Sequence, residues 1–227
     1  MIVPIRLKIS YAFLIKSRRP ILVDTGSPGE APRIARALER EGLRMTDLAL
    51  LLHTHGHADH CGSTADLKLL LEVPAAVHPA DAPMMRSGSN GVLHPTNFTG
   101  RLIMPFVNVP FPRVEPDILL REDYSLSEYG LPARIVTTPG HTSGSISVVF
   151  DDGRAITGDL LMGGILGGYV FPSIPGYHYY ADDLALLRQS IKKLLDLGVK
   201  QFFPGHGGPL DAAAVHKRFA RDFPQSS

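Results

Sequence analysis

The stretch His53-Thr54-His55-Gly56-His57-Ala58-Asp59-His60, residues 53–60, is the most informative part of this sequence. It holds four of the ten histidines of the chain, where an even distribution would place roughly 0.35 in eight residues. Directly before it, residues 49–52 form a short, continuously apolar run, which is typical of a strand covered on both faces. The sequence therefore predicts a histidine-rich loop at the carboxyl end of a buried strand.

The spacing within this stretch suits metal binding. In an extended segment His55 and His57 point to the same side, because side chains alternate along a strand. These two imidazoles can share one metal ion. Asp59 and His60 are displaced along the following turn, so they can reach a second ion close to the first.

Three further ligand candidates occupy the same kind of place later in the chain. His141, Asp159 and His206 each follow a predicted strand end and come directly after a glycine. Glycine lets the backbone turn sharply and approach an ion closely. Because these strand ends can meet at one sheet edge, the three side chains are expected to converge with residues 55–60.

The donor types indicate an open, catalytic metal centre. Imidazole and carboxylate ligands suit zinc, iron or manganese, and the lack of thiolates argues against a closed structural zinc site. Two divalent ions, zinc in the first place, can bridge a water and lower its pKa toward neutrality. We expect Asp159 to bridge both ions and Asp59 to ligate the second and carry a proton to the leaving group. The other histidines lack this context and are predicted to be ordinary side chains: His53, His78, His94, His178 and His216.

Hydrophobic periodicity indicates an α/β chain with strands and helices mixed. Strands are predicted at 3–9, 11–15, 21–23, 49–52, 75–77, 134–138, 145–150, 154–157 and 201–203, and helices from Ser27 to Gly42 and at 62–72, 80–86, 182–197 and 212–221. Residues 87–116 show no regular pattern and are interpreted as a long loop over the site. We expect one domain, residues 1–227, in which helices pack outside two layered sheets.

The composition of the sequence limits the classes of binding partner and the cellular compartments that can be expected. Lys and Arg total 23 against 22 Asp and Glu, so a formal net charge of +1 gives no general attraction for nucleic acid or an anionic membrane. Cys61 is the one cysteine, which excludes an intrachain disulfide. Residues 1–10 lack a signal-peptide pattern, and no apolar run approaches the roughly 20 residues of a membrane span. A cytoplasmic enzyme with a small-molecule substrate is the expectation.

The motif resembles the His-x-His-x-Asp-His signature of the metallo-β-lactamase superfamily, here His55-Gly56-His57-Ala58-Asp59-His60. The resemblance covers nearly the whole chain and includes Asp24-Thr25-Gly26, whose aspartate supports the site in that family. It implies a four-layer αββα sandwich with two metal sites. The first would be formed by His55, His57 and His141, and the second by Asp59, His60 and His206, with Asp159 between them.

Within the superfamily, the seven-ligand set is similar to that of glyoxalase II-like thioesterases, lactonases and phosphodiesterases. It departs from the commonest zinc β-lactamases, which have a cysteine where this chain has Asp159, and from flavodiiron reductases, which carry a glutamate where His57 stands. The resemblance thus implies a metal-bridged hydroxide that cleaves an ester, thioester or lactone of a small molecule. A promiscuous β-lactamase activity is compatible with the same centre.

Three alternatives stay open at this point. One is phosphodiester or phosphotriester hydrolysis at the same two-metal centre. Another is persulfide oxidation by a single iron, as in persulfide dioxygenases of the superfamily. The non-enzymatic alternative is a metal-stabilised binding or assembly module.

Aromatic side chains in residues 102–112 and 165–180 are expected to wall the site, with Tyr177 or Tyr179 donating a hydrogen bond to the substrate. The competing interpretation buries these aromatics in the core or in a homodimer interface. Cys61 is expected to be a small buried residue, the alternative being a thiol beside the metals.

Overall fold

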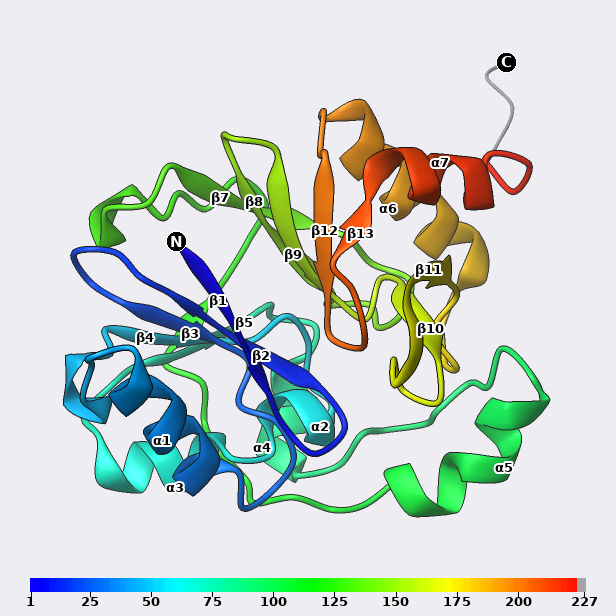
Figure 1. Ribbon diagram of the computed structural model, residues 1–227. Helices are drawn as coiled ribbons and strands as arrows, with labels where there is room; N and C mark the ends of the chain where they lie inside the picture. Colours follow the sequence, from blue (N-terminus) through cyan, green and yellow to red (C-terminus); the bar gives the residue numbers. More distant parts are fainter. Residues whose placement is uncertain (224–227) are drawn as a thin grey trace.

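The computed structural model describes residues 1–223, which contain two main sheets that face each other (Figure 1). The first sheet has six strands in the spatial order β1-β2-β3-β4-β5-β6. They are β1 (Ile2–Arg6), β2 (Tyr11–Ile15), β3 (Ile21–Val23), β4 (Leu50–Leu52), β5 (Ala75–Val77) and β6 (Ile118–Leu119). Strands β3 to β6 run parallel, so their carboxyl ends share one edge of the sheet. The histidine-rich stretch begins at this edge, directly after β4.

The second sheet has five strands in the order β13-β12-β9-β8-β7. They are β7 (Ala133–Thr137), β8 (Ile146–Phe150), β9 (Arg154–Gly158), β12 (Gln201–Pro204) and β13 (Leu210–Asp211). Strands β9 and β12 are parallel, and Pro204 pairs with Gly158 near their ends. The residues that follow these two strands, Asp159 and His206, therefore emerge at the same edge.

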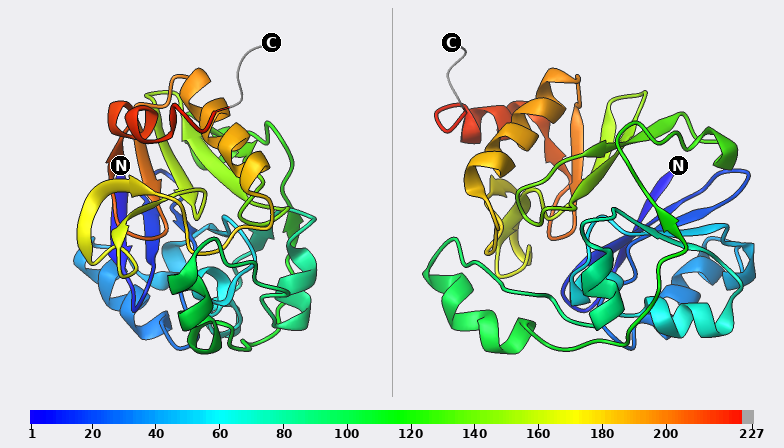
Figure 2. Two further views of the ribbon diagram at one scale, coloured as in Figure 1. Left: turned by 90° about the vertical axis from the view of Figure 1, so that its right-hand side faces the viewer. Right: turned by 180° about the vertical axis from the view of Figure 1, so that it is seen from behind.

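Helices cover the outer face of each sheet. Helices α1 (Ala31–Arg40) and α3 (Thr64–Leu70) pack on the first sheet through Ile34, Leu38 and Leu67. Helices α6 (Leu184–Asp196) and α7 (Ala212–Phe219) pack on the second sheet, where Leu187 and Phe219 are buried. Figure 2 shows this layering from two further directions.

The space between the two sheets is filled by apolar side chains from both of them, including Phe13 and Leu52 from the first and Val148 and Ile156 from the second. Such burial of apolar surface is the main force that holds the layers together. The order helix, sheet, sheet, helix confirms the predicted αββα sandwich.

Two segments differ from the prediction. Residues 87–116 are not irregular throughout, because they contain helix α5 (Phe98–Val107). The Asn97 side chain accepts a hydrogen bond from the Gly100 N–H and so caps this helix. Gly100 and Pro105, both poor helix formers, concealed it in the sequence. The glycine-rich stretch after Asp159, for which no element was predicted, forms an antiparallel hairpin of β10 (Met162–Ile165) and β11 (Val170–Gly176).

The first helix also begins later than predicted. Glu30, and not Ser27, is its N-cap, and the first turn contains Pro32. Gly29 has φ +82°, which no right-handed helix can include, so a helix starting near Ser27 could not continue.

The remaining helical segments are short. They are α2 (Ala58–Cys61), α4 (Ala82–Ser87) and the 3₁₀ turns Met45–Asp47 and Ser127–Tyr129. Within residues 1–223 no helix combines the length and the apolar character needed to cross a membrane.

Candidate metal centre

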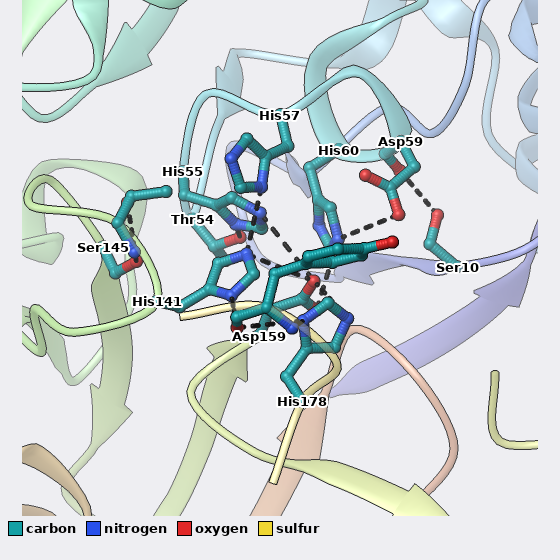
Figure 3. A network of polar contacts seen from close by, with 12 residues as sticks. Ser10, Thr54, His55, His57, Asp59, His60, His141, Ser145, Asp159 and His178 are labelled. Atoms are coloured by element: carbon teal, nitrogen blue, oxygen red, sulfur yellow. Dashed lines mark hydrogen bonds and ion pairs between the residues drawn. The ribbon is translucent and has the colours of Figure 1, made fainter. Parts of the chain in front are cut away.

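The structure brings all seven predicted ligands together at one edge of the sandwich. Figure 3 labels six of them, all except His206. The first group, His55, His57 and His141, and the second group, Asp59, His60, Asp159 and His206, each have their ligand atoms within 4.8 Å of one another. Asp159 lies between the groups. Its Oδ2 is 3.6 Å from His141 Nε2 and 3.4 Å from His206 Nε2.

The backbone explains this convergence. His141, Asp159 and His206 follow β7, β9 and β12, while Asp59 and His60 lie in the short helix α2. At Gly205 the fit leaves no room for a side chain. A Cβ there would lie 2.4 Å from His60 Cε1 and 2.5 Å from Asp159 Oδ1, so only glycine lets this strand end approach the centre.

Hydrogen bonds behind the cluster fix the orientation of the imidazoles. His141 Nδ1 lies 2.8 Å from the Tyr180 carbonyl oxygen, and His206 Nδ1 lies 2.7 Å from the Ile9 carbonyl oxygen. Each Nδ1–H donates to its carbonyl, so Nε2 is the ring nitrogen that faces the centre. Such partners hold metal-ligating histidines in one tautomer and orientation.

Asp24 supports the centre from behind. Its carboxylate accepts hydrogen bonds from the Thr54 N–H and hydroxyl, and its Oδ2 lies 2.8 Å from His60 Nδ1. Thr54 Oγ1 lies 3.1 Å from His55 Nδ1, so one buried carboxylate orients two ligands. This is the supporting place that the family resemblance implies for Asp24.

A second buried carboxylate, Asp81, ties two ligand loops together. It accepts hydrogen bonds from the Gly56 N–H, the Thr142 hydroxyl and the Gly144 N–H. Gly56 lies between His55 and His57, and Thr142 follows His141 directly. Asp81 therefore holds together the two loops that supply the first ligand group.

Several ligand atoms are buried without a hydrogen-bond partner among the described residues. These are His55 Nε2, His60 Nε2, Asp159 Oδ1 and His206 Nε2. An unpaired buried polar atom costs roughly 1–3 kcal/mol. His55 belongs to the first ligand group and the other three to the second, so each group offers unpaired atoms to a divalent cation, and the nitrogen and oxygen donors suit zinc or iron.

The electrostatics of the cluster agree with this fit. Burial lowers the pKa of His57 to about 3, and the neighbouring His141 adds to the effect, so His57 is neutral. Burial would raise the pKa of Asp159, but the surrounding imidazoles, His178 first, hold it well below its usual range. Burial would lower the pKa of His206, but the carboxylates of Asp159 and Asp59 raise it to about 10. The ionised carboxylates of Asp59 and Asp159 attract positive charge strongly, and the cluster is therefore suited to bind a cation.

His178, which sequence reasoning set aside, lies in the cluster. Its Nε2 is 3.2 Å from Asp159 Oδ2, and its ring stacks on His206 with centroids 5.2 Å apart. Burial lowers its pKa to about 3, so the ring is neutral. No motif surrounds His178, and only its place after the hairpin β10–β11 brings it here.

The two tyrosines predicted to contact the substrate lie in different places. The structure does not bring Tyr177 to the cluster: its hydroxyl donates to Asp222 and accepts from Arg188, and its ring packs on Phe219. Tyr179 does lie beside the centre, and its hydroxyl accepts a hydrogen bond from the Leu166 N–H at 3.0 Å.

The ligands open into a cavity of about 460 Å³. His57, Asp59, Asp159 and His206 form part of its wall, together with side chains of α5 and of the hairpin β10–β11. Of the aromatics expected to wall the site, Phe106 does line this cavity, whereas Phe111 is buried in the core beside α4. The size lies within the roughly 300–1,000 Å³ typical of small-molecule pockets.

Cys61 is fully buried at the end of α2, as expected for a small core residue. Its Sγ lies 3.2 Å from the His57 carbonyl oxygen. Burial raises the pKa of the thiol well above its ordinary value. The thiol therefore supports the loop and does not act as a thiolate ligand.

Comparisons with known proteins agree with this geometry. A family model described as the metallo-beta-lactamase superfamily matches residues 5–206. The chain is 28% identical over 202 residues to a probable metallo-hydrolase of Methanocaldococcus jannaschii, with 87% of each chain covered. It is 34% identical over 131 residues to a hydroxyacylglutathione hydrolase of Rhodopseudomonas palustris, which covers 57% of this chain and 38% of that protein. Among solved structures it is similar to TTHA1623 in a di-iron-bound form, with 27% identity, a TM-score of 0.68 and 98% of both chains covered.

Proposed function

The chain belongs to the metallo-β-lactamase superfamily, and from this premise we propose that it is a binuclear hydrolase of a small-molecule ester, thioester or lactone. One observation carries the proposal. Asp159 lies between two complete ligand groups, each with enough donors for one ion, at the wall of a pocket.

The proposed cofactors are two divalent ions, one in each ligand group. When bound, they would polarise the substrate carbonyl and lower the pKa of the attacking water toward neutrality. Zinc is our first expectation. Iron is the main alternative, since a similar protein has been solved in a di-iron-bound form, and manganese suits the same donors.

Asp59 is the proposed proton carrier. It is the most exposed member of its ligand group, with 24% of its side chain accessible, and it lines the pocket. In the reaction a new C–O bond forms between the water oxygen and the carbonyl carbon, and the bond to the leaving oxygen or sulfur breaks. Asp59 accepts the proton of the water and returns it to that leaving atom.

His178 and Tyr179 are the proposed donors to the substrate. His178 lines the pocket, and its Nε2 lies 3.2 Å from Asp159 Oδ2. In the tautomer in which Nδ1 accepts from the Tyr180 N–H at 3.3 Å, Nε2 carries the proton, and a substrate oxygen beside Asp159 would accept it. The Tyr179 hydroxyl accepts from the backbone of Leu166, which leaves its own hydrogen free. A donor aimed at the carbonyl oxygen stabilises the negative charge that develops on it.

Metal content and turnover on a substrate panel test this function. The wild type should bind about two divalent ions per chain and hydrolyse esters, thioesters or lactones, as expected for a two-metal centre. His57→Ala should lose part of the metal, and its turnover should fall by at least about 100-fold because a ligand is removed. His216→Ala is the matched control, because this side chain lies on α7, away from the cluster.

Other results would replace the proposal. One iron per chain with oxygen-dependent turnover of a persulfide would identify a dioxygenase. Turnover of phosphodiesters or phosphotriesters alone would identify a different hydrolase. Unchanged activity after complete removal of metal would contradict the mechanism.

A further inference from the structure

The pocket beside the metal ligands is walled on one side by a single face of α5. Thr99, Ile103, Phe106 and Val107 line it. Their spacing of four, three and one residues places them along one side of a helix. At 1.5 Å per residue this face is about 12 Å long, so the wall is an elongated stripe.

The opposite wall is also apolar. Ile9, Met162 and Leu166 line the pocket from the side of the first sheet and the hairpin β10–β11. Phe106 is 80% exposed and Leu166 is 64% exposed, although both are large apolar side chains next to a polar centre. Apolar surface left open beside a reactive site is typical of ligand binding.

Outside the metal ligands, the walls carry no positive charge. Among the described residues that line the pocket there is no lysine or arginine, and the acidic ones are Asp59 and Asp159. Arg6 comes near, with its guanidinium carbon 4.4 Å from the centroid of the Tyr169 ring, but it does not line the pocket. Outside the metal ligands, an anionic part of a substrate would therefore lack a cationic partner.

The helix is held at its place by several bonds. The buried Tyr180 hydroxyl donates to the Gly100 carbonyl oxygen at 2.7 Å, and the Thr96 N–H donates to the Tyr179 carbonyl oxygen at 2.8 Å. At the other end, Asn90 Nδ2 donates to the Val107 carbonyl oxygen at 3.1 Å. The apolar stripe therefore stays at a fixed position relative to the metal ligands.

We propose that the substrate carries a medium-length apolar acyl chain that lies along α5, opposite the hairpin β10–β11, with its carbonyl group at the metal ligands. This inference rests on the proposed function and names the substrate class for it. A neutral leaving group is part of the proposal, because the pocket offers nothing to pair with an anionic one.

A series of neutral acyl thioesters of N-acetylcysteamine tests the proposal in the metal-loaded protein. From acetyl to octanoyl, kcat/KM should rise about two- to four-fold for each buried methylene, and so by at least about 50-fold in total. S-octanoyl glutathione, with the same acyl group and a charged leaving group, should react at least about ten times more slowly than the neutral thioester, because its carboxylates would find no cationic partner.

Two variants on α5 test where the acyl chain of the substrate binds. Ile103→Glu places a carboxylate in the stripe and should abolish the preference for octanoyl over acetyl within one preparation. Leu102→Glu makes the same change at the neighbouring residue, which is 64% exposed and does not line the pocket, and should keep the preference.

The outcomes separate the two proposals. Equal turnover of acetyl and octanoyl thioesters would overturn the acyl-chain inference and leave the hydrolase intact. A failure of the loaded protein to cleave any ester, thioester or lactone would overturn the proposed function. If chain length has no effect and Phe106→Ala instead dissolves a dimer, the stripe is a contact between two copies of the chain, which also overturns the inference.

Discussion

At the scale of single residues, His178 gives the centre an imidazole beyond its seven predicted ligands. Five histidine Nε2 atoms lie within 3.9 Å of the Asp159 carboxylate oxygens: those of His55, His60, His141, His178 and His206. Apart from His178, these histidines belong to the two ligand groups of the proposed binuclear site. His178 also forms a third possible ligand group with His141 and Asp159, so its two candidate roles are metal ligand and substrate donor, and we favour the second.

We predict that His178→Leu lowers kcat by about 10- to 100-fold, because it removes a donor near the developing charge. Bound metal should stay near two ions per chain, and His178→Gln, whose amide can place a donor near the position of Nε2, should recover part of kcat. Steady-state kinetics together with elemental analysis check this. Loss of metal in both variants would show that His178 is a ligand.

The sequence predicted the seven candidate ligands that the structure brings together, and it missed His178 for a physical reason. The ligands follow strand ends in short motifs, so local spacing alone predicts their convergence. His178 depends on how the hairpin β10–β11 folds back, which is a tertiary effect. Tyr177 and Tyr179 follow the end of β11 at Gly176, and they diverge there because the chain is no longer extended.

At the scale of elements, α5 depends on its cap. Asn97 accepts from the Gly100 N–H at 2.9 Å, and the helix contains both a glycine and a proline. Asn97→Ala should cost about 1 kcal/mol of local helix stability. Amide exchange in residues 98–107 should quicken, and KM for a long-chain substrate should rise.

The matched control removes a cap of the same kind elsewhere. Asp211 caps α7 by accepting from the Ala213 N–H, and α7 packs away from the pocket. Asp211→Ala should destabilise the protein by a similar amount without changing KM. Equal effects of both variants on KM would mean that the wall formed by α5 does not govern binding.

The elements were predictable where their apolar residues follow one period. The sequence indicated α6 and most strands of both sheets with small errors at their ends. It failed for α5, because Gly100 and Pro105 lower helix propensity, and tertiary hydrogen bonds from Tyr180 and Asn90 help to hold that helix in place. It failed also for the hairpin β10–β11, because its strands are rich in glycine and proline.

At the scale of the whole molecule, the cluster should make the stability of metal-free protein depend on pH in both directions. The pKa values of His57 and His178 are lowered to about 3, so between pH 6.5 and 3 the unfolded chain binds protons that the folded one does not. As the pH decreases through this range, the free energy of unfolding therefore decreases by up to about 1.4 kcal/mol per pH unit for each group. The pKa of His206 is raised to about 10, so its contribution is full below pH 6.5 and is lost as pH rises toward 10.

Metal-free protein should therefore be most stable near pH 6.5. Urea unfolding of chelator-treated protein between pH 4 and 9 measures this, and two equivalents of zinc should raise the free energy of unfolding at pH 7. A stability that rises steadily to pH 9 would contradict these charge assignments.

The metal ligands and the apolar wall of the pocket lie in different segments of the chain, and this separation has a consequence for the evolution of the protein. The seven ligands lie directly after β4, β7, β9 and β12, whereas α5 belongs to the connection between β5 and β6, which supplies no ligand. Substitutions, insertions or deletions within α5 itself, away from Asp81 and Asn90 in the same connection, would change the shape of the pocket while the ligands keep their hydrogen bonds to Asp24 and Tyr180. Descendants of such a chain could acquire new substrates through mutations in α5 alone, while the ligand cluster is inherited unchanged.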